Sequence, residues 1–225
     1  MKHSAMKRIF LIAFAFTAIS LLPSPVMAQQ DHSTYYYQQK SLFERLLNTR
    51  GEILLIGDSI TDGGEWSELF KNRKVKNRGI SGDVTKGVLD RLEEITEGRP
   101  RKVFLMIGVN DLARGIPAEK ITENILLIVE RIRQASPKTK IYVQSILPVN
   151  DEFSKFANHV NKGEEIKSIN QRLREQAGKQ YQYIDLYSGF VTKEGKLNPE
   201  YTNDGLHLTG AGYLEWKKLI HKYIK

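Results

Sequence analysis

Cysteine is absent from the 225 residues of this chain. The absence excludes thiol nucleophiles and thiolate metal sites, and it excludes a disulfide framework as a source of stability. The fold must therefore be held by an ordinary hydrophobic core, and a composition of 40% hydrophobic and 27% charged residues suits one. The length fits one domain, because no interdomain linker, internal repeat or low-complexity tract divides the chain.

A strong excess of one charge is also lacking. The formal net charge is +8, and it falls to +5 without residues 1–28, which carry three basic residues and no acidic ones. The lysines and arginines are dispersed among acidic residues and are not interleaved with aromatic ones. Nucleic-acid interfaces show the opposite pattern, so we expect no nucleic-acid partner.

Only one long apolar run is present, at residues 9–22. Lys7 and Arg8 precede it, and two prolines and the small-residue pattern of residues 26–28 follow it, as in a secretory signal peptide. The run is shorter than the roughly 20 residues of a membrane span. We therefore expect cleavage after Ala28 and a periplasmic or secreted protein without a stable membrane anchor.

Strand and helix patterns alternate through the rest of the chain. Residues 29–50 are expected to form an extended arm (29–37) and a short helix (41–47), and residues 51–225 the main domain. Short apolar runs predict strands at 53–56, 75–80, 102–107, 140–147 and 181–186. Helical patterns cover 66–70, 84–95, 119–134, 160–177 and a last helix that Thr209 caps and that buries Leu214, Trp216, Leu219 and Ile220. This order predicts an α/β fold with a flavodoxin-like, five-stranded parallel sheet and helices on both faces.

A serine follows the first predicted strand in the sequence Gly57-Asp58-Ser59. Ligands of open α/β sheets bind beyond the carboxyl ends of the strands, so Ser59 is a candidate nucleophile for an acyl carbon. The next two strand ends carry similar glycine and polar patterns, at 79–83 and 108–111, and all three should meet at one rim. A single glycine of this kind would indicate no more than a tight turn.

A serine nucleophile needs a base, and His207 is the best placed histidine. It follows Asp204 by three residues in a turn-rich segment between the last strand and the last helix. One tight turn can place the Asp204 carboxylate on Nδ1 and leave Nε2 facing Ser59. The other candidates lie in the arm, beside the long loop 150–158 and in the last helix: His32, His159 and His221. A structural histidine without contact to Ser59 is the alternative for His207.

An oxyanion hole needs hydrogen-bond donors that are held in place in advance. The candidates are the backbone N–H groups of Ser59 and Gly82 and the side-chain amide of Asn110. Glycine lets substrate pass close to the backbone, and an asparagine amide donates without adding a charge beside the base. We expect Asp58 to shape the turn through backbone hydrogen bonds rather than to contact His207.

Together these blocks resemble the GDSL, or SGNH, acyl hydrolases, over the chain from Ile53 to the last helix. Residues 57–60 are similar to the first block, with Ile60 in place of the usual leucine, and Gly82 falls in the second. Residues 108–111 are similar to the third block and residues 204–207 to the fifth. Within the family, the chain looks most like small bacterial esterases related to lysophospholipase L1 and to platelet-activating-factor acetylhydrolase.

The resemblance implies a three-layer α/β/α sandwich and a serine esterase that needs no metal or organic cofactor. It implies the same roles as the residues themselves suggest: Ser59 as nucleophile, His207 as general base and acid, and Asp204 as its orienting partner. Ser59, Gly82 and Asn110 would be the oxyanion donors. The leucine-to-isoleucine change affects a packing residue and leaves these roles intact.

Three other functions fit the sequence less well. A binuclear metallophosphoesterase would need several imidazoles and carboxylates together, and only His207 is well placed. A non-catalytic glycan-binding module on the same fold would leave Ser59 without a chemical role. A phosphate-binding loop at 57–64 is disfavoured because no Gly-Lys-Ser/Thr follows.

The substrate is less constrained by the sequence. Short loops and the lack of a lid domain favour a short acyl group such as acetyl, carried by an O-acetylated carbohydrate such as a sialic acid or a plant-type glycan. A lysophospholipase or thioesterase is the alternative. Trp66 and Phe153 are candidate packing surfaces for a sugar or an acyl chain, with ordinary core or loop packing as the alternative for each.

Overall fold

Five parallel strands form the centre of the protein, in the order β2-β1-β3-β4-β5. They are β1 (Ile53–Gly57), β2 (Val75–Gly79), β3 (Lys102–Met106), β4 (Lys140–Gln144) and β5 (Gln182–Ile184). The computed structural model describes residues 31–225, so the expected signal peptide lies outside the described residues. The central strands β1 and β3 are buried at every position, which explains why both are nearly continuous apolar runs. The predicted five-stranded parallel sheet is confirmed.

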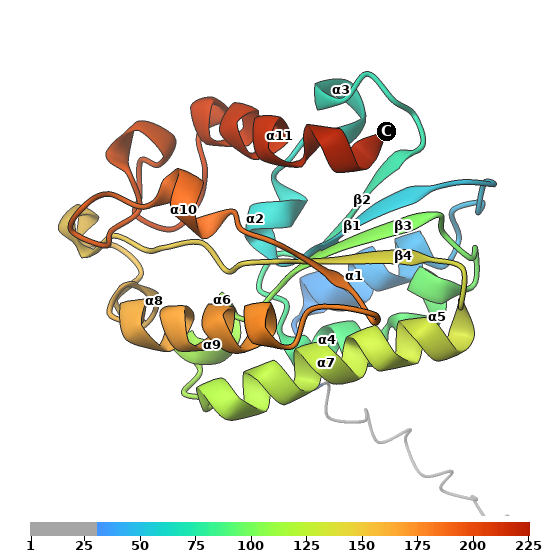
Figure 1. Ribbon diagram of the computed structural model, residues 1–225, viewed down its shortest axis with the longest axis horizontal. Helices are drawn as coiled ribbons and strands as arrows, with labels where there is room; N and C mark the ends of the chain where they lie inside the picture. Colours follow the sequence, from blue (N-terminus) through green and yellow to red (C-terminus); the bar gives the residue numbers. More distant parts are fainter. Residues whose placement is uncertain (1–30) are drawn as a thin grey trace, which may run out of the picture. The chain divides into compact units, whose positions relative to one another are not determined.

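Helices cover both faces of the sheet and complete a three-layer α/β/α sandwich (Figure 1). On the lower face in this view lie α1 (Thr34–Phe43), α4 (Thr85–Asp90), α5 (Leu92–Thr96), α7 (Ala118–Ala135) and α9 (Gly163–Glu175). On the upper face lie α3 (Trp66–Leu69), α10 (Tyr187–Phe190) and α11 (Gly210–Ile224). The remaining short elements are α2 (Ser59–Asp62), α6 (Val109–Ala113), α8 (Ala157–Val160) and the 3-10 helices η1 (Asp151–Phe153) and η2 (Pro199–Tyr201).

Each face of the sheet has its own packing pattern. Helix α7 buries isoleucine and valine at helical spacing, including Ile121, Ile125 and Ile132, as its sequence predicted. On the other face the rings of Trp66 and Trp216 meet edge to face with their centroids 4.8 Å apart. Burying one large apolar side chain stabilises a fold by about 1.5–3 kcal/mol. These contacts therefore hold the helical layers on both faces against the sheet.

The N-terminal arm differs from its prediction. Residues 34–37 are helical, because the Ser33 hydroxyl accepts a hydrogen bond from the Tyr36 N–H and so caps α1. The buried Tyr36 hydroxyl donates to the Gly87 carbonyl at 2.8 Å and anchors this helix on α4. The expected helix at 41–47 was also wrong in extent, since α1 ends at Phe43 and Leu47 is exposed.

Three helices differ in detail from the sequence expectation. The helix expected at 84–95 is two helices, because Arg91 leaves the helical conformation with a φ of −121°. The helix expected at 160–177 is α8 followed by α9. Leu214 was expected to face inward but is 57% exposed, because α11 buries the stripe at i, i+4 spacing made of Gly212, Trp216, Ile220 and Ile224.

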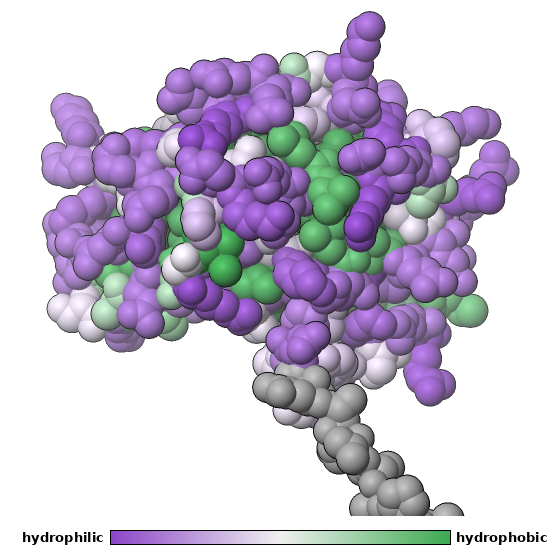
Figure 2. All heavy atoms as spheres, turned by 90° about the horizontal axis from the view of Figure 1, so that it is seen from below, coloured by the Kyte–Doolittle hydropathy of each residue, from purple (hydrophilic) through white to green (hydrophobic). Residues whose placement is uncertain are grey.

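The lower face is mainly hydrophilic on its outside, with smaller hydrophobic areas between the polar side chains (Figure 2). This matches an amphipathic outer layer such as α7, which turns charged residues to solvent. Within residues 31–225, none of the helices has the length and the apolar character that crossing a membrane requires.

Candidate active site

At the carboxyl ends of the strands, Ser59 meets two side chains from a distant part of the sequence, Asp204 and His207. Ser59 begins α2 directly after β1, and its Oγ lies 3.0 Å from Nε2 of His207. Nδ1 of His207 lies 2.8 Å from Oδ2 of Asp204. The structure therefore brings the predicted nucleophile, base and orienting acid into one hydrogen-bonded chain, the arrangement that activates a serine for attack on an acyl carbon.

The turn that carries Asp204 and His207 is held by its own backbone. Oδ1 of Asp204 accepts hydrogen bonds from the N–H groups of Leu206 and His207, at 2.9 and 2.8 Å. The Gly205 carbonyl accepts from the Asn150 N–H at 2.8 Å, which ties the turn to the segment after β4. Burial opposes ionisation of Asp204, but the hydrogen bonds from Leu206 and His207 outweigh it and lower the pKa of this carboxyl. Asp204 is therefore ionised and can hold an imidazolium.

Asp58 has the role expected for it. Its Oδ1 accepts a hydrogen bond from the Ile60 N–H at 3.0 Å and caps α2, so the carboxylate shapes the turn beside Ser59. Burial raises the pKa of Asp58 to about 7, because the ionised form is poorly solvated there. The carboxylate that contacts His207 is that of Asp204.

The strand before Ser59 requires glycine at its end. A Cβ on Gly57 would lie 2.2 Å from the Thr61 hydroxyl oxygen and 2.3 Å from the Met106 carbonyl oxygen. Real Cβ atoms do not approach that closely, so glycine alone lets β1 end against β3 and the start of α2. This close packing places Ser59 at the rim of the sheet.

The expected oxyanion donors come from three neighbouring segments. Gly82 has a φ of +78° in the turn after β2, and a Cβ there would meet no protein atom within 4 Å. Nδ2 of Asn110 donates to the Asp83 carbonyl at 2.9 Å, so this side chain lies against the Gly82 turn. Within residues 31–225, the N–H groups of Ser59 and Gly82 have no hydrogen-bond acceptor. Both N–H groups and the second N–H of Asn110 are left to bind a ligand oxygen.

A second set of hydrogen bonds joins α6 to the segment that follows Gly82. Both carboxylate oxygens of Asp111 accept from the Thr85 N–H, and Oδ1 also accepts from the Thr85 hydroxyl at 2.5 Å. Two consecutive residues of α6, Asn110 and Asp111, thus bind the backbone that follows Gly82. Such preorganisation is what electrostatic stabilisation of an oxyanion needs.

A cluster of buried charged side chains packs against the residue that follows Gly82. The Arg91 guanidinium donates to Asp83 at 3.0 Å, to Glu94 at 2.9 Å and to the Arg78 carbonyl at 2.9 Å. Burial raises the pKa of both Asp83 and Glu94, with the arginines opposing the shift. This cluster could not be predicted from the sequence, because nothing in a run of charged residues shows which of them become buried.

Two further residues at the site were missed from the sequence. Nε2 of His159 lies 2.9 Å from Oδ1 of Asn110. The Phe156 ring is 5.0 Å from the His207 ring and 5.9 Å from the His159 ring, in edge-to-face geometry with both. The only sequence signal was their place in or beside the long loop at 150–158, which also carries the candidate substrate residue Phe153.

The two candidate substrate surfaces have different outcomes. Trp66 is 1% exposed, its Nε1 donates to the Thr61 carbonyl and its ring is covered by Trp216 and Tyr213. The prediction that it contacts substrate was wrong, because the ring fills the core between α3 and α11. Phe153 is half-buried beside Gly205, in the turn that carries His207, so its contact with substrate stays a prediction.

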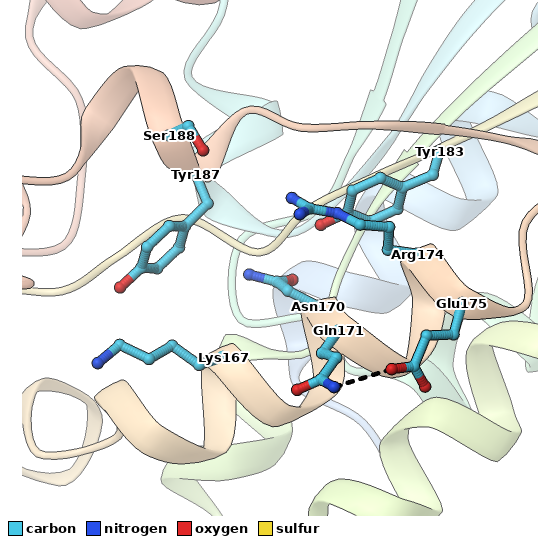
Figure 3. Close-up of a pocket in the computed structure, with 8 residues that line it drawn as sticks. All are labelled: Lys167, Asn170, Gln171, Arg174, Glu175, Tyr183, Tyr187 and Ser188. Atoms are coloured by element: carbon cyan, nitrogen blue, oxygen red, sulfur yellow. Dashed lines mark hydrogen bonds between the residues drawn. The ribbon is translucent and has the colours of Figure 1, made fainter.

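A cavity of about 490 Å³ lies elsewhere, between α9 on one side and β5 and α10 on the other (Figure 3). Its walls are Lys167, Asn170, Gln171, Arg174, Glu175, Tyr183, Tyr187 and Ser188. Gln171 donates to Glu175 within it, and the Arg174 guanidinium covers the Tyr183 ring and pairs with Asp185. None of its walls belongs to the Ser59 site, so the chemistry of the side chains rather than the size of a cavity identifies the active site.

Among residues 31–225, no group of three or more histidine, aspartate or glutamate side chains is arranged to hold a metal ion. The histidine nitrogens that face Ser59 and Asn110 are instead engaged in the hydrogen bonds described above.

The chain is similar to several known proteins over most of its length. The model of the GDSL-like lipase/acylhydrolase family matches residues 55–214. The chain is 31% identical over 181 residues to the alpha2 subunit of platelet-activating factor acetylhydrolase IB of Rattus norvegicus, covering 77% of this chain and 76% of the relative. Among solved structures, a GDSL-like lipase of Bacteroides thetaiotaomicron is 26% identical with a TM-score of 0.73, covering 84% of this chain and 96% of the other. A Streptococcus pneumonia protein described as a candidate platelet activating factor is 32% identical with a TM-score of 0.78, covering 85% and 93%.

Proposed function

The chain belongs to the GDSL-like lipase/acylhydrolase family and is a serine ester hydrolase, and we propose that Ser59, Asp204 and His207 carry out its reaction through an acyl-enzyme intermediate. The observation that carries this proposal is the hydrogen-bonded chain from the Ser59 hydroxyl through His207 to Asp204. A neutral imidazole at 3.0 Å can take the serine proton, and an ionised Asp204 stabilises the imidazolium that forms.

In the first half-reaction Ser59 Oγ bonds to the ester carbonyl carbon while its proton passes to Nε2 of His207. The carbonyl oxygen becomes negative and accepts hydrogen bonds from the N–H groups of Ser59 and Gly82 and from Nδ2 of Asn110. When the tetrahedral intermediate collapses, the ester C–O bond breaks and the proton on Nε2 moves to the leaving alcohol. Each fixed donor lowers the barrier by on the order of 3 kcal/mol.

In the second half-reaction water replaces the alcohol. Its oxygen bonds to the acyl carbon, its proton goes to Nε2 of His207, and the proton then returns to Ser59 Oγ as the carboxylic acid leaves. His207 thus serves as base and acid in turn. Every proton transfer uses the one nitrogen that faces Ser59.

The proposed substrate is a short-acyl ester, with acetyl as the acyl group. Support comes from two kinds of relative that match this chain, the alpha2 and alpha1 subunits of platelet-activating factor acetylhydrolase IB, which are called acetylhydrolases. We place the acetyl group on a carbohydrate, since the half-buried ring of Phe153 and the exposed ring of Phe156 lie beside the site and can pack against a sugar. The expected signal peptide adds an exported location to this proposal.

The test is hydrolysis of p-nitrophenyl esters by purified protein and its Ser59→Ala variant. Ser59→Ala should lower kcat by about 10³-fold or more, because no other group can form the acyl-enzyme. Ser67→Ala, at an exposed serine of α3, is the matched control and should behave as wild type. An unchanged rate in Ser59→Ala would contradict the assigned nucleophile and favour a binding function on this fold.

The substrate is tested by acyl-chain length and by acetyl release. We expect the acetyl ester to be preferred over longer esters, and acetate to be released from an O-acetylated sugar panel that includes sialic acids and xylan-type glycans. A preference for long acyl chains without acetate release from any sugar would favour a lysophospholipase or thioesterase. Detection of the mature N-terminus at Gln29 in exported protein would support cleavage after Ala28.

A further inference from the structure

We propose that His159 is a positioning residue that orients the Asn110 amide toward the oxyanion. The proposal rests on the proposed function, because it assigns a partner to one of the three oxyanion donors. It is carried by a 2.9 Å contact between Nε2 of His159 and Oδ1 of Asn110. His159 would touch neither Ser59 nor the acyl group and would act through Asn110 alone.

The Asn110 amide can adopt two orientations that exchange its oxygen and its nitrogen. The Asp83 carbonyl only accepts hydrogen bonds, so Nδ2 must face it, at 2.9 Å. This leaves Oδ1 on the side of His159 and one N–H of Nδ2 free for the substrate oxygen. His159 donates through its Nε2–H and makes this orientation favourable, because an acceptor at the same place would repel Oδ1.

The hydrogen bond between His159 and Asn110 is shielded from water, and this makes it hard to replace. Asn110 is 9% exposed, and His159 is half-buried on α8, which packs against α6. Water is therefore a poor substitute for the His159 N–H as a partner of Oδ1. Without this donor the amide would sample other orientations, and the N–H meant for the oxyanion would be misdirected part of the time.

The charged and titratable groups around His159 are His207 and Arg114. Burial first, and then these two groups, lower the pKa of His159, so its ring is neutral at neutral pH. A neutral ring donates from one nitrogen only, and the contact with Asn110 selects the Nε2–H tautomer. A neutral His159 also avoids placing a second cation close to His207 at the moment His207 takes the serine proton.

The backbone just before His159 has a strained conformation that positions the His159 side chain. Ser154 and Phe156 both have left-handed conformations, with φ of 53° and 52°. Non-glycine residues adopt this conformation at an energetic cost, and such strain clusters at functional sites. The Phe156 carbonyl accepts the His159 N–H at 2.7 Å, which closes the turn and presents both rings to the site. Phe156 then lies against both imidazoles.

The experiment compares His159→Leu and His159→Gln in the full protein, with p-nitrophenyl acetate as substrate. Leucine fills the space but cannot donate, whereas a glutamine amide can donate to Oδ1. We expect His159→Leu to lower kcat by about tenfold with little change in KM, and His159→Gln to restore most of the loss. His221→Leu, the same substitution at an exposed histidine of α11, should leave kcat unchanged.

The same change made in an Asn110→Ala background separates positioning from a general structural effect. If His159 acts through Asn110, His159→Leu should cause no further loss there. Loss of the full tenfold factor in that background would overturn the proposal, and so would a His159→Gln variant as impaired as His159→Leu. If His159→Leu does not fold, His159→Ala takes its place in the cycle.

The failure of this inference can be told apart from that of the proposed function. An active Ser59→Ala variant would overturn both. An inactive Ser59→Ala variant together with wild-type kcat in His159→Leu would overturn only the positioning role.

Discussion

Nε of Arg91 lies 3.0 Å from Oδ2 of Asp83, and neither side chain is exposed to solvent. This buried ion pair connects the break between α4 and α5 to the residue that follows Gly82. It links the stability of the fold to the geometry of the oxyanion site, because the Asp83 carbonyl also binds the Asn110 amide.

Arg91→Met should destabilise the protein by about 3–5 kcal/mol, since it leaves Asp83 and Glu94 buried without their partner. Denaturant unfolding measures the loss. Lys86→Met is the matched control, because Lys86 pairs with Asp90 on the solvent-exposed side of α4, the helix that ends before Arg91, and its removal should cost much less stability. Equal losses of unfolding free energy in the two variants would contradict a stabilising role of the buried charge cluster.

Asp204→Asn should lower kcat by about 10³–10⁴-fold and change the stability little. Asparagine can still accept the backbone N–H groups of the turn, but it cannot stabilise a charged His207. Asp185→Asn is the control, because Asp185 also accepts a backbone N–H three residues further on, from Ser188, and lies outside the site. Steady-state kinetics and a thermal melt test both statements, and a nearly active Asp204→Asn enzyme would refute the assignment.

Asp58→Asn should reduce the loss of stability that occurs as pH rises from about 4 to about 7. The folded-state pKa of Asp58 is raised to about 7, whereas an unfolded aspartate titrates near 3.9. The stability associated with this carboxyl is therefore fully present below the unfolded pKa and is lost as pH rises through about 7. Asparagine keeps the cap on Ile60 and does not ionise. Melting temperatures at pH 5 and pH 8 should differ more in the wild type than in the variant, and an equal difference would contradict the raised pKa.

Gly82→Ala should impair catalysis more than stability. The φ of +78° makes alanine strained by about 1–2 kcal/mol, and the methyl group would project into the open space beside the oxyanion donors. Gly115→Ala provides a close match, with a φ of +77° and equally open surroundings but no place among the donors. We expect similar shifts in melting temperature from both variants and a large fall in kcat/KM from Gly82→Ala alone. Similar kinetics in the two would argue against Gly82 as a donor.

Features set by local physical chemistry could be predicted from the sequence. The strands were predicted because parallel strands are buried on both faces and must be apolar, as in β1 and β3. The Asp204–His207 contact was predicted because it spans three residues and needs one turn. His207 was assigned to Ser59 because it follows Asp204 in a turn-rich segment between the last strand and the last helix. Gly82 and Asn110 were assigned to the same site because the strand ends of a parallel sheet share one rim.

Tertiary structure alone decided which side chains become buried and which partners they find. Trp66 and Arg91 look like surface or loop residues in the sequence, yet one fills the core and the other holds a buried charge cluster. The contact of His159 with Asn110 joins residues 49 positions apart, through a short helix whose orientation depends on two left-handed residues. Local patterns record periodicity and turn chemistry, whereas packing between distant segments depends on how the whole chain closes, and that determines the partners of each donor in the site.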